Sequence, residues 1–224
     1  MKKLILYAFS LLTIVTNVAC NMPQTETDKE LLLAAKSGDS KTVTRLLSAN
    51  PALEIRDENR RTPLMLATLG NHVEVARLLI EKGADVNAQD DIQDSPFLYA
   101  GASGFVDIAR ICISHGADFK IYNRFGGTAL IPAAEKGHSG MVEELLKIKG
   151  FPKDHVNRLG WTAVLETVIL TNGSAKFVGI LKMLVDAGCN VNIPDADGVT
   201  ALTHARRKKY GQMVDILDKA GAKE

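Results

Sequence analysis

The sequence has few cysteines, few aromatic residues and no excess of charge of either sign. Its 224 residues include three cysteines and one tryptophan, and aromatic residues make up 5% of the chain. The 27 lysines and arginines nearly equal the 26 aspartates and glutamates. Proteins that bind nucleic acid carry a strongly basic surface, so this balance argues against a nucleic-acid partner. Three cysteines allow one disulfide at most.

The sequence also lacks the familiar catalytic motifs. It contains no Cys-x-x-Cys, His-Glu-x-x-His or Gly-x-Ser-x-Gly sequence, no Walker loop and no dinucleotide-binding fingerprint. These absences weigh against the enzyme classes that carry such motifs. We therefore expect a protein that is not an enzyme and that uses no metal or cofactor.

One long apolar segment lies at the start of the chain. Lys2 and Lys3 precede an apolar run from Leu4 to about Val15, which is the layout of a secretory signal peptide. The run is interrupted by polar residues and is shorter than the ~20 apolar residues that span a bilayer. We therefore expect export and removal of residues 1–19 rather than a permanent transmembrane helix.

The end of this segment, Asn17-Val18-Ala19-Cys20, resembles a bacterial lipobox, in which cleavage before the cysteine leaves that cysteine lipidated. The resemblance implies a lipid on Cys20 and a short tether over residues 20–27. It also implies a place on a periplasm-facing membrane, with the outer membrane favoured in a Gram-negative source because Asn21 follows the cysteine. Asn17 departs from the leucine that lipoboxes prefer, so a secreted or periplasmic form without lipid stays open.

The rest of the sequence repeats with a period near 33. Triplets such as Thr62-Pro-Leu recur at spacings of 33, 33, 34 and 38, and the glycines that follow them recur at 33, 34, 38 and 33. A step of 33 back from Thr62 reaches Lys29, in a segment with the same apolar pattern. The period predicts six units, at about residues 28–58, 59–91, 92–124, 125–158, 159–196 and 197–224.

Each unit predicts two helices followed by a tight connector. The Thr or Ser of each triplet is typical of a helix N-cap, and Pro63 and Pro96 occupy the first helical position, where no N–H is needed. A second segment repeats apolar residues at three- and four-residue steps and stops at glycine. The connectors then open with Asp57, Asp90, Asn123, Asn157 and Asp195.

The pattern T-P-L-x-x-A followed by G-A-D-V-N resembles the ankyrin repeat. The resemblance covers residues 28–224, and residues 131–138 and 154–166 are similar to exported bacterial ankyrin proteins in particular. It implies a mostly α-helical solenoid of about six helix-turn-helix units joined by tight turns. It also implies a protein-protein interaction module that holds a protein partner, such as an effector to be neutralised or a periplasmic enzyme to be supported, in a concave groove. The polar ends of the repeat array favour a monomer.

By resemblance, the groove is formed by the connector tips and by the exposed face of each first helix. The tips contribute three large apolar residues that we expect to be exposed, together with arginines. The position four residues after the first residue of each triplet contributes side chains beside the exposed helix face. The predicted partner-binding residues are Arg124, Phe125, Arg158, Leu159, Trp161, Tyr99, Glu135, Glu166 and His204.

Alternatives remain for four of these residues. Trp161 has a structural alternative, in which it folds over its own turn against the next unit. Glu166 and His204 have another, an ion pair between neighbouring units. A metal-binding or catalytic site built from Glu135, Glu166 and His204 is a further alternative function.

Several remaining features predict structure alone. His72 and His138 match a structural Gly-His position of the repeat, and His115 lies where it can meet the last carbonyls of a helix. Cys112 and Cys189 should lie about 20 Å apart in a stack of helices, too far for a disulfide. The five extra residues of the fifth unit, around 171–176, predict a longer loop between its two helices.

Overall fold

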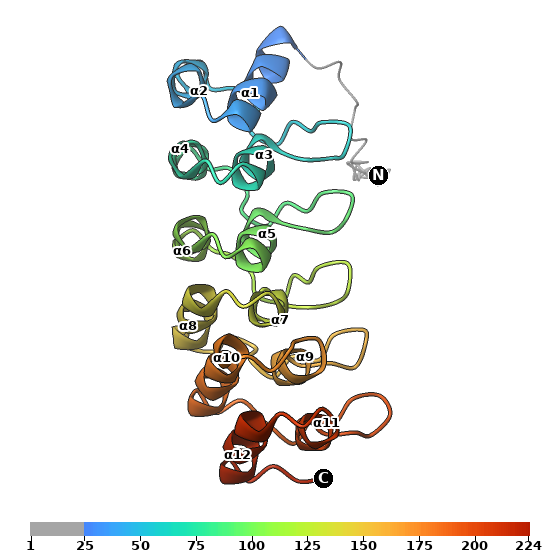
Figure 1. Cartoon of the computed structure of the whole chain (residues 1–224). Helices are drawn as coiled ribbons and strands as arrows, with labels where there is room; N and C mark the ends of the chain where they lie inside the picture. The colour runs from blue at the N-terminus through green and yellow to red at the C-terminus, as the bar shows by residue number, and fades with distance from the viewer. Residues whose placement is uncertain (1–24) are drawn as a thin grey trace, which may run out of the picture.

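The structure, a computed structural model, describes residues 25–224. The described residues form twelve α-helices and no strand, arranged as six helix-turn-helix pairs stacked along one axis (Figure 1). The predicted α-helical solenoid of six units is therefore confirmed. The predicted signal peptide and Cys20 lie outside the described residues. None of the helices within residues 25–224 is long and apolar enough to cross a membrane.

The helices form two parallel rows, with the connectors projecting as a third row (Figure 1). The inner row, between the outer helices and the connectors, holds the first helix of each unit: α1 (Glu26–Ser37), α3 (Pro63–Leu69), α5 (Pro96–Ser103), α7 (Leu130–Glu135), α9 (Ala163–Ile169) and α11 (Ala201–Arg207). The outer row holds the second helices: α2 (Ser40–Leu47), α4 (Val73–Glu81), α6 (Val106–Ser114), α8 (Ser139–Lys147), α10 (Ala175–Asp186) and α12 (Gly211–Lys219).

Helix α1 begins at Glu26 and so includes the last two residues of the tether predicted over residues 20–27. Thr25 caps α1 by accepting a hydrogen bond from the backbone N–H of Asp28, and the Asp28 carboxylate accepts one from the N–H of Thr25. This reciprocal capping box satisfies two orphan donors and starts the helix at Glu26. Residues 26 and 27 are therefore helical rather than part of a tether.

Four of the five predicted triplet caps form. The hydroxyls of Thr62, Ser95, Thr162 and Thr200 each accept the backbone N–H three residues on. Thr128 does not, and its enclosed hydroxyl has no partner among the described residues. In the second unit, the Leu66 N–H donates to the Thr62 carbonyl at 2.9 Å and forms the first turn of the helix. Pro132 holds the equivalent position in the fourth unit and has no N–H to donate to the Thr128 carbonyl, so the first turn does not form there. Helix α7 therefore begins at Leu130 and has only six residues.

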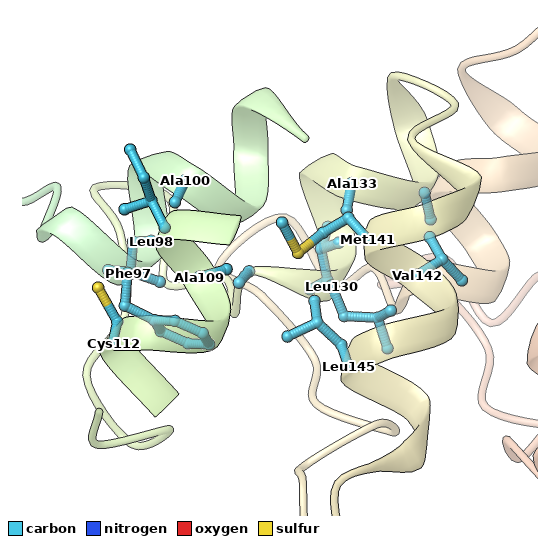
Figure 2. Close-up of a cluster of buried hydrophobic side chains, with 14 of the residues drawn as sticks. Phe97, Leu98, Ala100, Ala109, Cys112, Leu130, Ala133, Met141, Val142 and Leu145 are labelled. Atoms are coloured by element: carbon cyan, nitrogen blue, oxygen red, sulfur yellow. The ribbon is translucent and has the colours of Figure 1, made fainter. Parts of the chain in front are cut away.

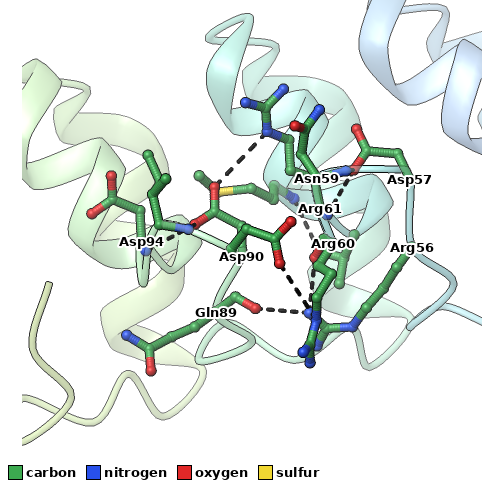
Figure 3. Close-up of polar contacts among 12 residues, drawn as sticks. Arg56, Asp57, Asn59, Arg60, Arg61, Gln89, Asp90 and Asp94 are labelled. Carbon is green, nitrogen blue, oxygen red and sulfur yellow. Dashed lines mark hydrogen bonds and ion pairs between the residues drawn. The ribbon is translucent and has the colours of Figure 1, made fainter. Parts of the chain in front are cut away.

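Each connector is held by the side chain of its opening residue. The Asp90 carboxylate accepts the backbone N–H groups of Ile92 and Asp94, both at 3.0 Å, and the Asp90 N–H closes the loop by bonding the Asp94 carbonyl at 3.0 Å. Figure 3 shows this loop beside the preceding one. Arg56, which precedes the Asp57 connector, donates a hydrogen bond to the Gln89 carbonyl at 2.7 Å. Hydrogen bonds therefore hold each connector in one conformation and join it to the connector of the adjacent unit.

One hydrophobic core runs the length of the stack, from Leu31 in α1 to Leu217 in α12. Figure 2 shows its middle, where side chains such as Phe97 and Leu145 lie in adjacent units. Cys112 and Cys189 are buried and unbridged, as the spacing of the units predicts. Burial raises the pKa of each thiol to about 12, so both are inert at neutral pH.

In the second, fourth and sixth units, the residue that opens the second helix reaches back to the preceding unit. The His72 ring lies 3.2 Å from the Lys36 carbonyl, and the Tyr210 hydroxyl donates to the Thr171 carbonyl at 2.7 Å. His138 packs against Gly104 in the same way. His115 instead lies 2.9 Å from the Ile111 carbonyl of its own helix. The structural roles predicted for the three histidines are therefore confirmed.

The insertion in the fifth unit is only partly a loop. The turn before α10 is longer than its counterparts, but α10 itself has 12 residues where α8 has nine, so Ala175 and Lys176 are helical. The predicted loop over 171–176 is thus wrong for its last two residues. The Lys176 ammonium bonds the Lys136 carbonyl at 3.2 Å and so takes the place that His72 occupies in the second unit.

Removing the Tyr210 hydroxyl should loosen the longer turn. We expect Tyr210→Phe to lower the free energy of unfolding by about 1 kcal/mol, because the Thr171 carbonyl loses its partner. Urea denaturation followed by circular dichroism measures this. Tyr122→Phe is the control, since Tyr122 acts through its ring, stacked 4.2 Å from that of His155. Equal losses in the two variants would contradict the role given to the hydroxyl.

Candidate partner-binding cleft

An open cleft of about 310 Å³ lies on the connector side of the inner helix row, across the third, fourth and fifth units. We call it the central cleft. Helices α5, α7 and α9 and the residues that end them form its floor, and three connectors form its wall. Its lining residues are Asp94, Ala102, Asn123, Arg124, Phe125, Gly127, Ile131, Pro132, Glu135, Lys136, Asn157, Leu159, Glu166 and Leu170.

Two large apolar side chains stand at the tips of the wall. Phe125 is 49% exposed and Leu159 is 50% exposed. Asn123 and Asn157 hold these tips, each accepting the backbone N–H of the apolar residue at 3.0 Å. Fixed loops thus present apolar surface to solvent beside a concavity, the arrangement in which binding hot spots occur.

Arg124 joins the apolar tip to an acidic group. Its guanidinium carbon lies 4.7 Å from the centre of the Phe125 ring, and Nη1 lies 3.8 Å from the Asp94 carboxylate. Burial and the nearby Asp90 raise the pKa of Asp94, while Arg124 and Lys136 oppose the rise. The cations of the cleft therefore offset the charge of Asp94.

Glu166 is a buried carboxyl group on the floor of the cleft. Its side chain accepts a hydrogen bond from the Asn157 amide at 2.8 Å, and the residue is only 5% exposed. Burial, followed by the nearby Glu135 carboxylate, raises the pKa of Glu166 to about 7, and the Asn157 hydrogen bond opposes that rise. The group can therefore change its charge near neutral pH.

The central cleft brings together five of the nine predicted binding residues: Arg124, Phe125, Glu135, Leu159 and Glu166. Arg158, Trp161, Tyr99 and His204 do not line it. Arg158 is exposed but binds the preceding connector. Its Nη1 donates to the Arg124 carbonyl at 2.9 Å, and its backbone N–H donates to the Phe125 carbonyl at 2.9 Å. Its stem also covers Gly126.

Trp161 is not an exposed tip residue. It is partly buried and packs against the hydrophobic core, while its backbone N–H donates to the Asn157 side chain at 3.0 Å. The prediction that its side chain would be exposed is wrong, because the connector turns this position inward just before α9. The packing favours the structural alternative. Tyr99 is likewise half-buried, with its ring 6.2 Å from that of Phe105.

The alternative of an ion pair between Glu166 and His204 is wrong. His204 Nε2 lies 2.6 Å from the Asp195 carboxylate, and Glu166 bonds Asn157. In both cases the partner is the residue nine positions earlier that opens the connector of the same unit. A side chain in the first turn of the inner helix lies over that connector, so it finds a partner there before it can reach the next unit.

Sequence reasoning missed the polar partner of Glu166 and part of the apolar floor. The signal for Asn157 was present, because a polar residue nine positions before the inner-helix residue recurs at Asp195 and His204. Ile131 and Leu170 gave no such signal, since each continues an ordinary helical pattern. Within residues 25–224 no three His, Cys, Asp or Glu side chains gather where they could hold a metal ion.

The comparisons with known proteins agree with this architecture. The family model for ankyrin repeats (3 copies) matches residues 7–90 and 31–123. The chain is 33% identical over 193 residues to the ankyrin repeat protein YahD of Escherichia coli (strain K12), and the match covers 86% of this chain and 96% of YahD. The chain belongs to the ankyrin-repeat family.

Solved structures of ankyrin-repeat proteins share the whole stack. An ankyrin repeat domain of Acinetobacter baumannii AYE (ABAYE2397) is 49% identical with a TM-score of 0.83, over 86% of this chain and 98% of that one. The ankyrin repeat protein EF0377 is 39% identical with a TM-score of 0.84, over 87% and 99%. Ankyrin repeats are typically non-catalytic and present extended concave surfaces to proteins, so this ankyrin-repeat protein is a protein-protein interaction module.

The raised pKa of Glu166 predicts that Glu166→Gln increases the free energy of unfolding, and that the increase depends on pH. The folded state of the wild type holds the Glu166 proton up to about pH 7, whereas the ordinary pKa is 4.5, so wild-type stability falls as the pH rises between these values. We expect Glu166→Gln to be more stable than the wild type by about 1 to 2 kcal/mol at pH 8 and to lose that advantage by pH 5. Urea denaturation at the two pH values measures this. A variant that is less stable than the wild type at both pH values would contradict the claim that the buried, ionised Glu166 carboxylate destabilises the fold.

Proposed function

We propose that this ankyrin-repeat protein is an exported, non-catalytic module that captures a protein partner in the central cleft. The observation that carries the proposal is the pair Phe125 and Leu159, which are half exposed on adjacent rigid connectors beside a concavity. Exposed apolar side chains at fixed positions bind without a large loss of conformational entropy. The expected partner is therefore a protein with a projecting segment that covers both side chains.

The composition of the cleft supports a protein partner over a small ligand. The cleft is open, spans parts of three units and combines the aromatic ring of Phe125 with the stacked guanidinium of Arg124. Phenylalanine and arginine are among the residue types enriched in the cores of protein interfaces. A small ligand would instead need a pocket that encloses most of its surface.

The location is part of the same proposal and rests on the N-terminal sequence. Cleavage of a signal peptide before Cys20 and a lipid on Cys20 would tether the protein to a periplasm-facing membrane. Because Thr25 already caps α1, only residues 20–24 would separate the lipid from the folded part, a reach of at most ~18 Å at ~3.5 Å per residue. The partner would then lie near the membrane, as a toxic effector to be neutralised or an enzyme to be supported. Without the lipid, the protein would be secreted or periplasmic and bind the same partner.

The binding role of the two tips predicts a loss of capture without a loss of stability. Crosslinking in the native envelope would identify the partner, and we expect Phe125→Ala and Leu159→Ala each to weaken its binding by about tenfold or more. The thermal midpoint should change little, because both side chains are half exposed. Leu33→Ala is the matched control, since Leu33 is 66% exposed but lies in the first unit. Unchanged binding by both tip variants would exclude the cleft as the binding surface.

The proposed lipid anchor predicts a change of cell fraction. We expect the wild-type chain to sediment with membranes and Cys20→Ser to appear in the soluble fraction, because a serine cannot take the lipid. Immunoblots of the membrane and soluble fractions measure this. A wild-type chain that is soluble from the outset would favour the secreted form without lipid.

A further inference from the structure

We propose that the central cleft accepts a lysine or arginine side chain of the partner, whose cation pairs with Glu166 while its stem lies along the apolar wall. The inference rests on the proposed function and specifies the chemistry of the partner. It follows from the charge, the openness and the surroundings of Glu166.

Glu166 lacks a cationic neighbour in the part of the chain that the structure describes. No ion pair within residues 25–224 includes Glu166, and the charged group that acts on its pKa is another carboxylate, Glu135. The neutral Asn157 amide gives it one hydrogen bond. A buried carboxylate beside a second carboxylate is costly unless a cation joins it.

Glu166 can be reached from the central cleft. Asn157 occupies Oε1 alone. The fully enclosed side-chain polar atoms that lack a partner within residues 25–224 are Arg61 Nε and Thr128 Oγ1. Oε2 of Glu166 is not one of these enclosed atoms, and Glu166 lines the central cleft. Oε2 is therefore accessible from the cleft.

The cations that line the cleft act on groups other than Glu166. Arg124 lies 3.8 Å from Asp94 and over the Phe125 ring. Lys136 lowers the pKa of Asp94 and is not among the groups that act on Glu166. On the other side, His204 of α11 pairs with Asp195. The side of the cleft that holds Glu135 and Glu166 is thus left with uncompensated negative charge.

The shape of the site selects a side chain over a bare ion. Within residues 25–224 no third His, Cys, Asp or Glu side chain joins the two carboxylates, so a divalent cation would find few anionic ligands here. Leu159, Ile131 and Pro132 supply apolar surface beside Glu166. Lysine and arginine carry an apolar stem and a charged end, which match these two kinds of surface. An apolar residue next to the cation in the partner would then cover Phe125.

Peptide selection on the full chain tests this chemistry. A phage library of random 12-residue peptides is selected on the wild-type chain at pH 8, where Glu166 is ionised, and bound peptides are resynthesised with a fluorescent label. We expect the selected peptides to share a lysine or arginine next to Leu, Ile or Phe. Replacing that lysine by norleucine, which keeps the stem, should weaken binding about tenfold by fluorescence anisotropy.

A double-mutant cycle assigns the contact to Glu166. On Glu166→Gln the norleucine replacement should change binding less than about twofold, because the pairing is already lost. Glu143→Gln, on the outer helix α8 with an exposed carboxylate, should leave the tenfold difference unchanged. Urea denaturation of Glu166→Gln at pH 8 checks that the variant is folded under the conditions of the binding assay. Glu135→Gln should weaken the lysine peptides as well, but less, since Glu135 is more exposed.

The outcomes separate this inference from the proposed function. Peptides that lose affinity on Phe125→Ala but carry no cation, or that bind equally with norleucine, overturn the inference and leave the function in place. Selection of acidic peptides also overturns it, since Arg124 or Lys136 would then be the recognition group. An empty selection, or peptides indifferent to both Phe125→Ala and Leu159→Ala, counts against the proposed function itself.

Discussion

The structure depends on the stacking of units that cannot bury their own apolar faces. Each helix pair covers its neighbour, and the resulting core runs without interruption from Leu31 to Leu217. Polar contacts set the register of the same stack. Asn87, for example, binds both the Gly116 carbonyl and the Asp118 N–H of the next unit. Because each contact joins adjacent units only, stability accumulates along one dimension.

This stacking leaves one long side of the inner helices free, and the central cleft lies there. Core contacts occupy the side that faces the outer row, while the side toward the connectors is free to vary. The cleft occurs where the repeat is least regular. Pro132 shortens α7, and the Thr128 hydroxyl does not cap that helix. Glu166 stands at the position occupied by the apolar Leu66 in the second unit. A site that binds a partner is expected to break local rules that the rest of the fold obeys.

The fifth unit shows how the stack accommodates extra residues. Its additional length lies partly in the turn and partly in a longer α10, and neither change disturbs the core positions of that helix. Lys176 and Tyr210 then connect the turn to the units on either side. The free energy of closing a slightly longer loop is small, and these contacts offset it. The insertion is therefore absorbed without a break in the solenoid.

The sequence by itself determined the period, the helix pairs, the connector residues and the positions of the exposed tips. These features are local, because caps, glycines and apolar spacing act within a few residues of one another. Only the tertiary structure decided which way Trp161 turns and which partners Glu166 and His204 take. Those choices depend on the direction in which each side chain leaves its helix and on the nearest polar atom in three dimensions. Spacing along the chain placed Glu166 and His204 on neighbouring helices, but the connector of each unit lay closer.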